Sequence, residues 1–463
     1  MSDVWAQPVE QNSIEVPPPL MRDTAPSAFD GAADSGAVQG NSLQSPPQLS
    51  TALPANADVH VRRLASMVRQ ILERSPELMQ AEAESRQTDS QLSEAKANRW
   101  PTLAVTGNAG RETQRYGASS RTLEFNAQRQ LQTRIAMPIV DLENEATIRQ
   151  RESKVVVADW ALTDVRDRVV LRAVDAYAEI LRATQLMELA RDNLKTHRAY
   201  VAQMKEIART DIGRASDLPV AAARVSLAES VLTSRLSRLE AARVQWSVLS
   251  GLASPQFGRD GFNVPMPMLP STLDAAVAHA QENSPQLRQA QANMDVAQKQ
   301  IDIAKSAWYP KLNAETRMTS GNDYGGIAGG QSDRYYGLGV EWRLGASTHY
   351  ANNTAVESLM AATHARDSMV LKIRGDVTTQ WYDALAAVAS MKSFDDYVSS
   401  AGQVVSAYKD QFKIGRRSLL DVLNAENELF TARSNATTAR VDAAVAAWHL
   451  LSLQGSLRQE LGL

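Results

Sequence analysis

Residues 169–204 read VVLRAVDAYAEILRATQLMELARDNLKTHRAYVAQM and lie within a 74-residue stretch, 139–212, that contains neither glycine nor proline. As one α-helix this stretch would extend for about 110 Å, which is wider than a single globular domain. Apolar side chains recur in it every seven residues, the spacing of a coiled-coil seam. The two neighbouring seams consist of Ala173, Ile180, Met187, Leu194 and Val201, and of Ala176, Ala183, Ala190 and Met204. The sequence therefore predicts very long helices that pack side by side through small residues.

The chain also contains two copies of one pattern. Matched positions are 209 residues apart near the start of each copy and 202 residues apart near its end. The matched pairs are Ser75-Pro76 with Ser284-Pro285, Trp100-Pro101 with Tyr309-Pro310, Tyr177 with Tyr382, Gly213 with Gly415, and Trp246 with Trp448. This self-similarity predicts a tandem duplication of roughly 190 residues.

The duplication divides the chain into five parts. We expect a leader at 1–58, a first repeat at 59–252, a proline-containing linker at 253–271, a second repeat at 272–455 and a tail at 456–463. The leader holds 8 of the 18 prolines, seven acidic residues and one basic residue, a composition typical of disorder. It has neither a basic nor an apolar signal region, so we expect no signal peptide in it.

Four segments change the hydrophobic period from seven residues to two. In 122–136 the odd positions include Leu123, Phe125, Leu131 and Ile135, whereas the even positions from 122 to 134 are polar. Residues 310–320 and 333–344 alternate in the same way, and 102–109 do so more weakly. Such alternation predicts strands with one apolar and one polar face, here two β-hairpins at about 101–140 and 310–345.

These strands have the pattern of membrane strands, although a soluble sheet with one buried face would show it as well. The chain has no run of about 18 apolar residues that could form a transmembrane helix, so only a β-barrel could carry it through a bilayer. Four strands are too few to close a barrel, whereas a trimer would supply twelve. Trp342, Tyr335 and Tyr336 could then belong to an aromatic girdle at the membrane interface.

Composition excludes several other classes of protein. The 49 basic and 52 acidic side chains give a net charge of −3, with no basic block to bind nucleic acid. The absence of cysteine excludes disulfides, thiolate metal sites and a lipid-acceptor cysteine. The six histidines lack ligand spacing, and no catalytic or nucleotide-binding motif occurs, so we expect no metal, no cofactor and no enzyme.

One turn makes the pattern more specific. Residues 412–425 read FKIGRRSLLDVLNA, and with the duplicated helix, hairpin, long helix and return helix they resemble the TolC family of outer-membrane channel-tunnels. The resemblance covers about residues 59–455. It implies a mainly α homotrimer with a twelve-stranded β-barrel in outer-membrane lipid and an α-helical barrel in the periplasm. It also implies two partners, a periplasmic adaptor (membrane fusion protein) and an inner-membrane ABC or RND transporter.

The residues of the two helix-to-helix turns have a physical interpretation of their own. Gly213 and Gly415 follow the long helices where a left-handed residue is needed, and Ser216 and Ser418 can cap the returning helices. Asp421 stands three residues after Ser418, as in a capping box, so it could simply be a carboxylate favoured by the helix N-terminus.

The resemblance implies functional roles for the same turns. It places Asp421 and Asn424 in the pore constriction, and Arg417, Phe412 and Asp217 in the gating of the tip. Here Phe412 replaces a tyrosine, and Asp217 could substitute for a carboxylate partner of Arg417. The residues implied to dock the adaptor are Gly213, Arg214, Ser216, Gly415, Arg416 and Ser418.

We therefore expect an export duct in the outer membrane of a Gram-negative-type bacterium that extends into the periplasm. Type I protein secretion is the leading function, because the missing lipid-acceptor cysteine disfavours the lipoprotein branch of efflux channels. Multidrug efflux is the alternative. A soluble periplasmic coiled-coil scaffold or adaptor is the alternative from another class.

Overall fold

The computed structural model describes residues 59–116, 121–210, 216–255, 267, 270–323 and 329–463, without the side chains of 59–60 and 112–128. The expected leader and much of the expected linker lie outside this range. The first half contains α1 (Val59–Leu72), α2 (Pro76–Ala97), β1 (Thr102–Tyr116), β2 (Arg121–Val140), α3 (Leu142–Thr210) and α4 (Asp217–Ser250). The second contains α5 (Leu273–Asn283), α6 (Pro285–Ser306), β3 (Lys311–Asn322), β4 (Gly330–Glu341), α7 (Ala346–Lys413), α8 (Leu419–Leu453) and α9 (Leu457–Leu461).

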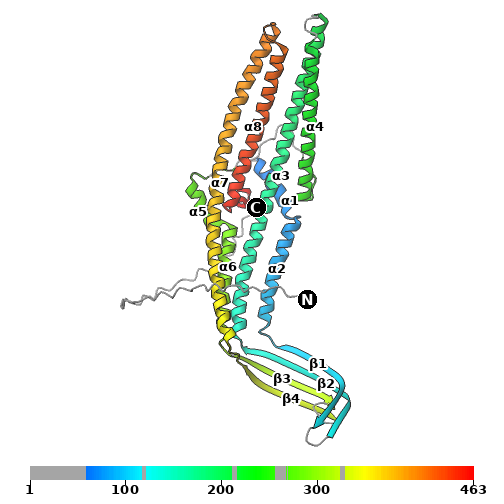
Figure 1. Cartoon of the computed structure of the whole chain (residues 1–463), viewed down its shortest axis with the longest axis vertical. Coiled ribbons are helices and arrows are strands. Elements are labelled where there is room, and N and C mark those ends of the chain that lie inside the picture. Colours follow the sequence, from blue (N-terminus) through cyan, green and yellow to red (C-terminus); the bar gives the residue numbers. More distant parts are fainter. Residues whose placement is uncertain (1–58, 117–120, 211–215, 256–266, 268–269, 324–328) are drawn as a thin grey trace, which may run out of the picture. The chain divides into compact units, whose positions relative to one another are not determined.

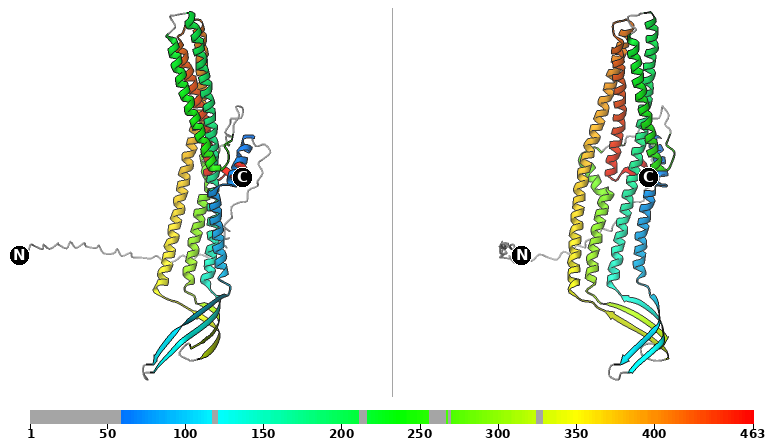
Figure 2. Two further views of the ribbon diagram at one scale, coloured as in Figure 1. Left: turned by 90° about the vertical axis from the view of Figure 1, so that its right-hand side faces the viewer. Right: turned by 45° about the vertical axis from the view of Figure 1, so that its right-hand side comes forward.

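The two longest helices, α3 and α7, run from the sheet to the opposite end of the helical region (Figure 1). Each is extended by about 100 Å, since α3 has 69 residues and α7 has 68. Near the sheet, α2, α3, α6 and α7 lie side by side, whereas α4 and α8 replace α2 and α6 toward the tip (Figures 1 and 2). The predicted long helices are therefore confirmed, although Ile139 and Val140 end β2 instead of starting α3.

Four of the five residues in the predicted heptad seam of α3 are buried, and the fifth, Val201, is partly buried. Ala173, Ile180, Met187 and Leu194 are each at most 6% exposed, because α3 packs against α2, α4, α6 and α8 along its length. Its counterpart α7 lies at the edge of the layer and contacts α5, α6 and α8. The matched tyrosines consequently differ, since Tyr177 is 1% exposed and Tyr382 60%.

The largest apolar core joins the two repeats. The matched Trp246 and Trp448 are both 1% exposed and belong to one cluster, to which α1, α3, α4, α8 and α9 contribute. Leu457 and Leu461 of α9 are fully buried in the same cluster. Burial of this apolar surface stabilises the halves as one body.

The four strands form one antiparallel sheet in the order β1-β2-β3-β4. The two predicted hairpins are present, and β2 pairs with β3 to join them, with Ile135 opposite Thr316. β1 and β2 continue past the last β2–β3 pair, at Arg129 and Asn322, so they are longer than the roughly ten residues of the alternating pattern.

One face of the sheet is mainly apolar, and its charged residues include Arg334, which lies opposite Met318. Residues opposite each other on neighbouring strands share a face, and the register therefore assigns every side chain to one of two sides. The apolar face carries Leu103, Val105, Leu131, Ile135, Met137, Met318, Tyr336, Leu338 and Val340, all at least 39% exposed in the single chain. The polar face carries Thr106, Asn108, Gln130, Gln132, Arg134, Asn313, Glu315, Arg317, Thr319, Asp333 and Tyr335.

This register corrects one expectation about the aromatic residues. Tyr335 and Tyr336 are consecutive in β4 and therefore point to opposite faces. Only Tyr336 lies on the apolar face, so Tyr335 cannot belong to a girdle on that face. In the part of the chain that the structure describes, no helix is both long enough and apolar enough to cross a bilayer.

Candidate functional site

The turn from α7 to α8 is built by Gly415, at the end of the helical region far from the sheet (Figure 1). Gly415 has φ +73°, a left-handed conformation that favours glycine. Its N–H donates to the carbonyl of Phe412 at 3.0 Å, and the N–H of Arg416 donates to that of Gln411 at 2.9 Å. These two bonds form a Schellman motif, which confirms the predicted conformation of Gly415.

Ser418 starts α8 with a complete capping box. Its hydroxyl accepts from the N–H of Asp421 at 3.2 Å, and the Asp421 carboxylate accepts from the Ser418 N–H at 3.3 Å. The Ser418 hydroxyl also donates to Asp421 Oδ2 at 2.8 Å. This hydroxyl is the main reason that the pKa of Asp421 lies below its ordinary value. The expected cap is confirmed.

Arg417 is fixed by three contacts within its own turn. Its guanidinium carbon lies 4.3 Å from the ring centroid of Tyr408, a cation–π distance. Its Nε donates to Gln411 Oε1 at 3.0 Å, and its Nη1 lies 3.8 Å from Asp421 Oδ2. Asp217, at the start of α4, is not among the contacts of Arg417 in the described chain, so the structure does not bring these two residues together.

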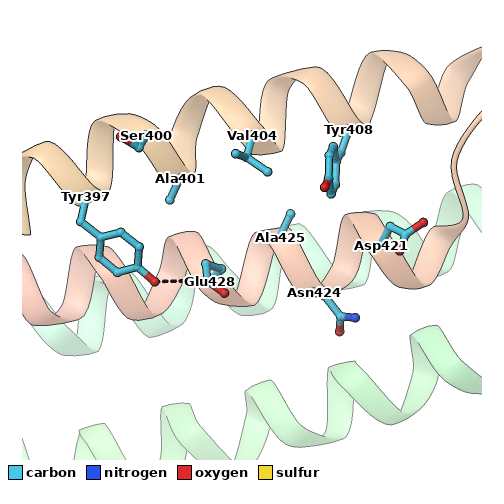
Figure 3. Close-up of a pocket in the computed structure, with 9 residues that line it drawn as sticks. All are labelled: Tyr397, Ser400, Ala401, Val404, Tyr408, Asp421, Asn424, Ala425 and Glu428. Carbon is cyan, nitrogen blue, oxygen red and sulfur yellow. Dashed lines mark hydrogen bonds between the residues drawn. The ribbon is translucent and has the colours of Figure 1, made fainter.

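A groove of about 410 Å³ runs between α7 and α8 beside this turn (Figure 3). Asp421, Asn424 and Glu428 line it from α8, and Tyr397 and Tyr408 line it from α7. Tyr397 donates a hydrogen bond to Glu428 across the groove. The groove therefore combines two carboxylates with two aromatic rings.

Asn424 also connects α8 to the other helix pair. Its Oδ1 accepts from Arg224 Nη2 of α4 at 2.9 Å. The two residues expected at the constriction thus differ in their contacts, because Asp421 bonds within its own turn and Asn424 bonds to α4.

The remaining expected tip residues have different positions. Phe412 is 5% exposed and packs in an apolar cluster with Met204, Leu419 and Val422, so it lies in the core of the tip. Arg416 is exposed. Gly213 and Arg214 lie outside the described residues.

The expected cap at Ser216 is wrong. Ser216 has φ −67° and ψ −20°, and its side chain makes no capping hydrogen bond. A capping side chain needs an extended backbone to reach the first free N–H groups, and this backbone is helical.

A buried polar cluster near the tip was not predicted from the sequence. Glu426 Oε1 accepts from the hydroxyl of Tyr200 at 2.9 Å and lies 2.6 Å from Lys409 Nζ, which joins α3, α7 and α8. Tyr200 and Glu426 are each 8% exposed, and burial raises the pKa of Tyr200. The available signal was a glutamate at an apolar helical position, between Val422 and Leu429.

Comparison with known proteins assigns this architecture. A family model described as outer membrane efflux protein matches residues 67–245 and 276–456, once in each repeat. The chain is 24% identical over 324 residues to outer membrane protein TolC of Vibrio cholerae, covering 67% of this chain and 72% of TolC. It is 21% identical to alkaline protease secretion protein AprF of Pseudomonas aeruginosa, covering 78% of both chains.

Solved structures have the same fold. The structure of CusC has a TM-score of 0.72 at 14% identity and covers 89% of this chain and 97% of its own. The open state of the MtrE outer membrane channel of Neisseria gonorrhoeae has a TM-score of 0.70 at 18% identity, and the match covers 90% of this chain and 96% of the MtrE chain.

The two family matches confirm the predicted duplication, and they identify a channel and not an enzyme. They also overturn the alternative of a soluble periplasmic scaffold or adaptor. The chain belongs to the outer membrane efflux protein family, the TolC-like channels of the Gram-negative outer membrane that function within tripartite efflux systems.

Proposed function

We propose that three copies of this chain form the outer-membrane duct of a type I protein secretion system. The observation that carries the trimer is the apolar face of the sheet, which is exposed in the single chain and bordered by two strand edges, β1 and β4. In lipid, unpaired strand edges are too costly to persist. Twelve strands from three sheets close into a barrel with the apolar face toward lipid and the polar face toward the lumen.

The helical tip is the proposed gate of this duct. In three copies, Asp421 and Asn424 surround the pore constriction, and Arg417, Phe412 and Asp217 take part in closing it. The exposed side chains of Arg416 and Ser418 support a docking role for the turns, which consist of Gly213, Arg214, Ser216, Gly415, Arg416 and Ser418. The partner at these turns is a periplasmic adaptor that connects the duct to an inner-membrane ABC transporter.

Two relatives support protein as the cargo. AprF and proteases secretion protein PrtF of Dickeya chrysanthemi are named for protease secretion, and PrtF covers 79% of this chain at 20% identity.

Drug efflux, with an RND transporter as partner, is the second candidate. It is favoured by the similarity to outer membrane efflux protein BepC of Brucella suis, 23% identical and covering 67% of this chain. The same duct architecture serves either cargo, so the distinction requires an experiment in the host.

Deletion of the gene tests the proposal directly. The secreted and surface-bound proteome is compared with sensitivity to detergents and antibiotics, in the deletion strain and after complementation with the wild-type gene. Loss of one or a few large secreted proteins with unchanged sensitivity is the expected result. Hypersensitivity with an intact secreted proteome would establish efflux instead, and no change in either would contradict both functions.

A further inference from the structure

One row of residues across the middle of the sheet carries two arginines side by side. The register places Ala104 of β1, Arg134 of β2, Arg317 of β3 and Tyr335 of β4 directly opposite one another on the polar face. Like charges at directly opposite positions are destabilising unless other groups compensate them. The two arginines are compensated in different ways.

Arg134 is neutralised by an ion pair. Its Nη2 donates to Glu315 Oε2 at 2.8 Å, and Glu315 lies in the next row toward the helices. Arg317 makes no ion pair within the part of the chain that the structure describes. Its guanidinium carbon instead lies 5.3 Å from the ring centroid of Tyr335. A guanidinium on an aromatic ring keeps its charge and its N–H donors available to a ligand.

Gly337 provides the space for this stacked pair. A Cβ atom at Gly337 would overlap the hydroxyl of Tyr335, so the tyrosine side chain occupies the space of the missing side chain. The ring therefore lies along its own strand on the polar face, where Arg317 stacks on it. Glycine here has a packing role, because any side chain would displace the ring.

The row lies at the depth of the apolar face. Met318, which follows Arg317, is on the apolar face, and so are Tyr336 and Leu338 on the neighbouring strand. On the outside, Arg317 is therefore flanked by these apolar side chains and by one charged residue, Arg334, which lies opposite Met318. Ionisable residues within membrane segments mark substrate or ion pathways, and rings of arginine select anions.

We infer that Arg317, stacked on Tyr335, is an anion-binding site that takes carboxylate groups of the substrate as it crosses the outer membrane. The inference rests on the proposed trimeric duct, in which three copies of Arg317 face one lumen. The next row on the polar face, toward the end of β3 at Asn322, holds Asp333. The positive charge is therefore confined to a narrow band of the lumen. Its charge is opposite to that of the three Asp421 carboxylates at the tip.

Planar bilayer recordings on the purified full-length protein test this site. Citrate serves as the carboxylate probe, and the reversal potential in a potassium chloride gradient reports ion selectivity. In Arg317→Gln the half-blocking citrate concentration should rise roughly tenfold, the effect of losing a charge-assisted hydrogen bond. The reversal potential should shift toward cations. Arg317→Lys should keep the reversal potential but weaken the citrate block, because lysine lacks the planar fork that matches a carboxylate.

Arg334→Gln is the matched control. Arg334 lies on the same strand as Tyr335 but on the opposite face, since its register partner is Met318. The variant removes the same charge and should leave both readouts unchanged. Absence of channels from the wild-type protein would overturn the duct and the site together. Wild-type channels with unchanged citrate block in Arg317→Gln, or in Arg317→Lys if the first variant does not assemble, would overturn the anion site alone.

Discussion

Asp421 caps the start of α8 with one carboxylate oxygen, and its other oxygen is available to a ligand. Its hydrogen bonds with Ser418 and its contact with Arg417 all use Oδ2, and Oδ1 accepts no hydrogen bond within the described residues. The carboxylate stays partly exposed, at 41%, beside the groove between α7 and α8. The capping role and the proposed constriction are therefore compatible, because they use different oxygens.

Replacing Asp421 with asparagine should weaken the block of channel current by divalent cations. Asparagine keeps the shape and can still accept from the Ser418 N–H, but it lacks the charge that hard cations require. We expect the half-blocking concentration of calcium to rise about tenfold in planar bilayers. Asp410→Asn is the control, since Asp410 is an exposed carboxylate of the same tip that pairs with Lys413. Equal calcium block in Asp421→Asn and wild type would remove Asp421 from the constriction.

Local geometry explains which single residues the sequence could predict. Gly415 and Ser418 act within a few residues of their own positions, so their conformations followed from the turn sequence. Glu426 and Tyr200 are 226 residues apart and meet only through packing of α3 on α8. The predicted cap at Ser216 is wrong because a serine before a helix does not fix its own backbone conformation.

At the scale of elements, the hydrophobic period correctly predicts which segments are helices and which are strands. It does not predict which helices pack together or which strands pair. The seven-residue and two-residue periods belong to single segments, whereas the pairing of β2 with β3 joins different repeats. The faces of the sheet follow from this pairing. Consecutive residues of a strand point to opposite faces, so lysines introduced at two neighbouring positions should affect assembly differently.

Leu338→Lys should reduce the amount of assembled trimer in the outer membrane, and Gly339→Lys should not. Leu338 is 68% exposed on the apolar face, where a lysine in lipid costs about 2–4 kcal/mol. Gly339 lies on the polar face, and a Cβ atom at this position would have open space around it. Heat-modifiable trimer on an SDS gel measures assembly. Equal yields of the two variants would mean that the apolar face does not meet lipid.

At the scale of the whole molecule, a histidine–aspartate contact joins α3 of the first repeat to α8 of the second, and a second histidine is buried on α3. His449 Nε2 lies 2.9 Å from Asp175 Oδ1, and this hydrogen bond raises the pKa of His449. His197 is 3% exposed on α3, and burial lowers its pKa. The sequence predicts the duplication, but the His449–Asp175 contact and the burial of His197 depend on how the helices pack.

The thermal unfolding midpoint should therefore be highest near the ordinary histidine pKa of about 6.5. The raised pKa of His449 stabilises the fold fully below that pH, and the contribution is lost as the pH rises through the folded pKa. The lowered pKa of His197 destabilises the fold as the pH falls below about 6.5, because the unfolded chain binds the proton more readily. Midpoints measured between about pH 5 and 8 should lose their alkaline decline in His449→Gln and their acid decline in His197→Gln.

His364→Gln is the control for both limbs. His364 is exposed on α7 and lies outside the apolar core clusters. A pH profile of His449→Gln that matches the wild type would show that the His449–Asp175 contact does not join the repeats in solution.

The pairing of β2 with β3 also means that the sheet cannot be completed until the second repeat has been exported. Arg129 of β2 pairs with Asn322 of β3, 193 positions later in the chain. A nascent chain that enters the periplasm from its N-terminus therefore presents the β2 edge and its apolar side chains long before their partner strand arrives. Exposed edges of this kind pair readily with other chains. The interval between the two hairpins thus defines a period of biogenesis in which a holding chaperone would prevent aggregation.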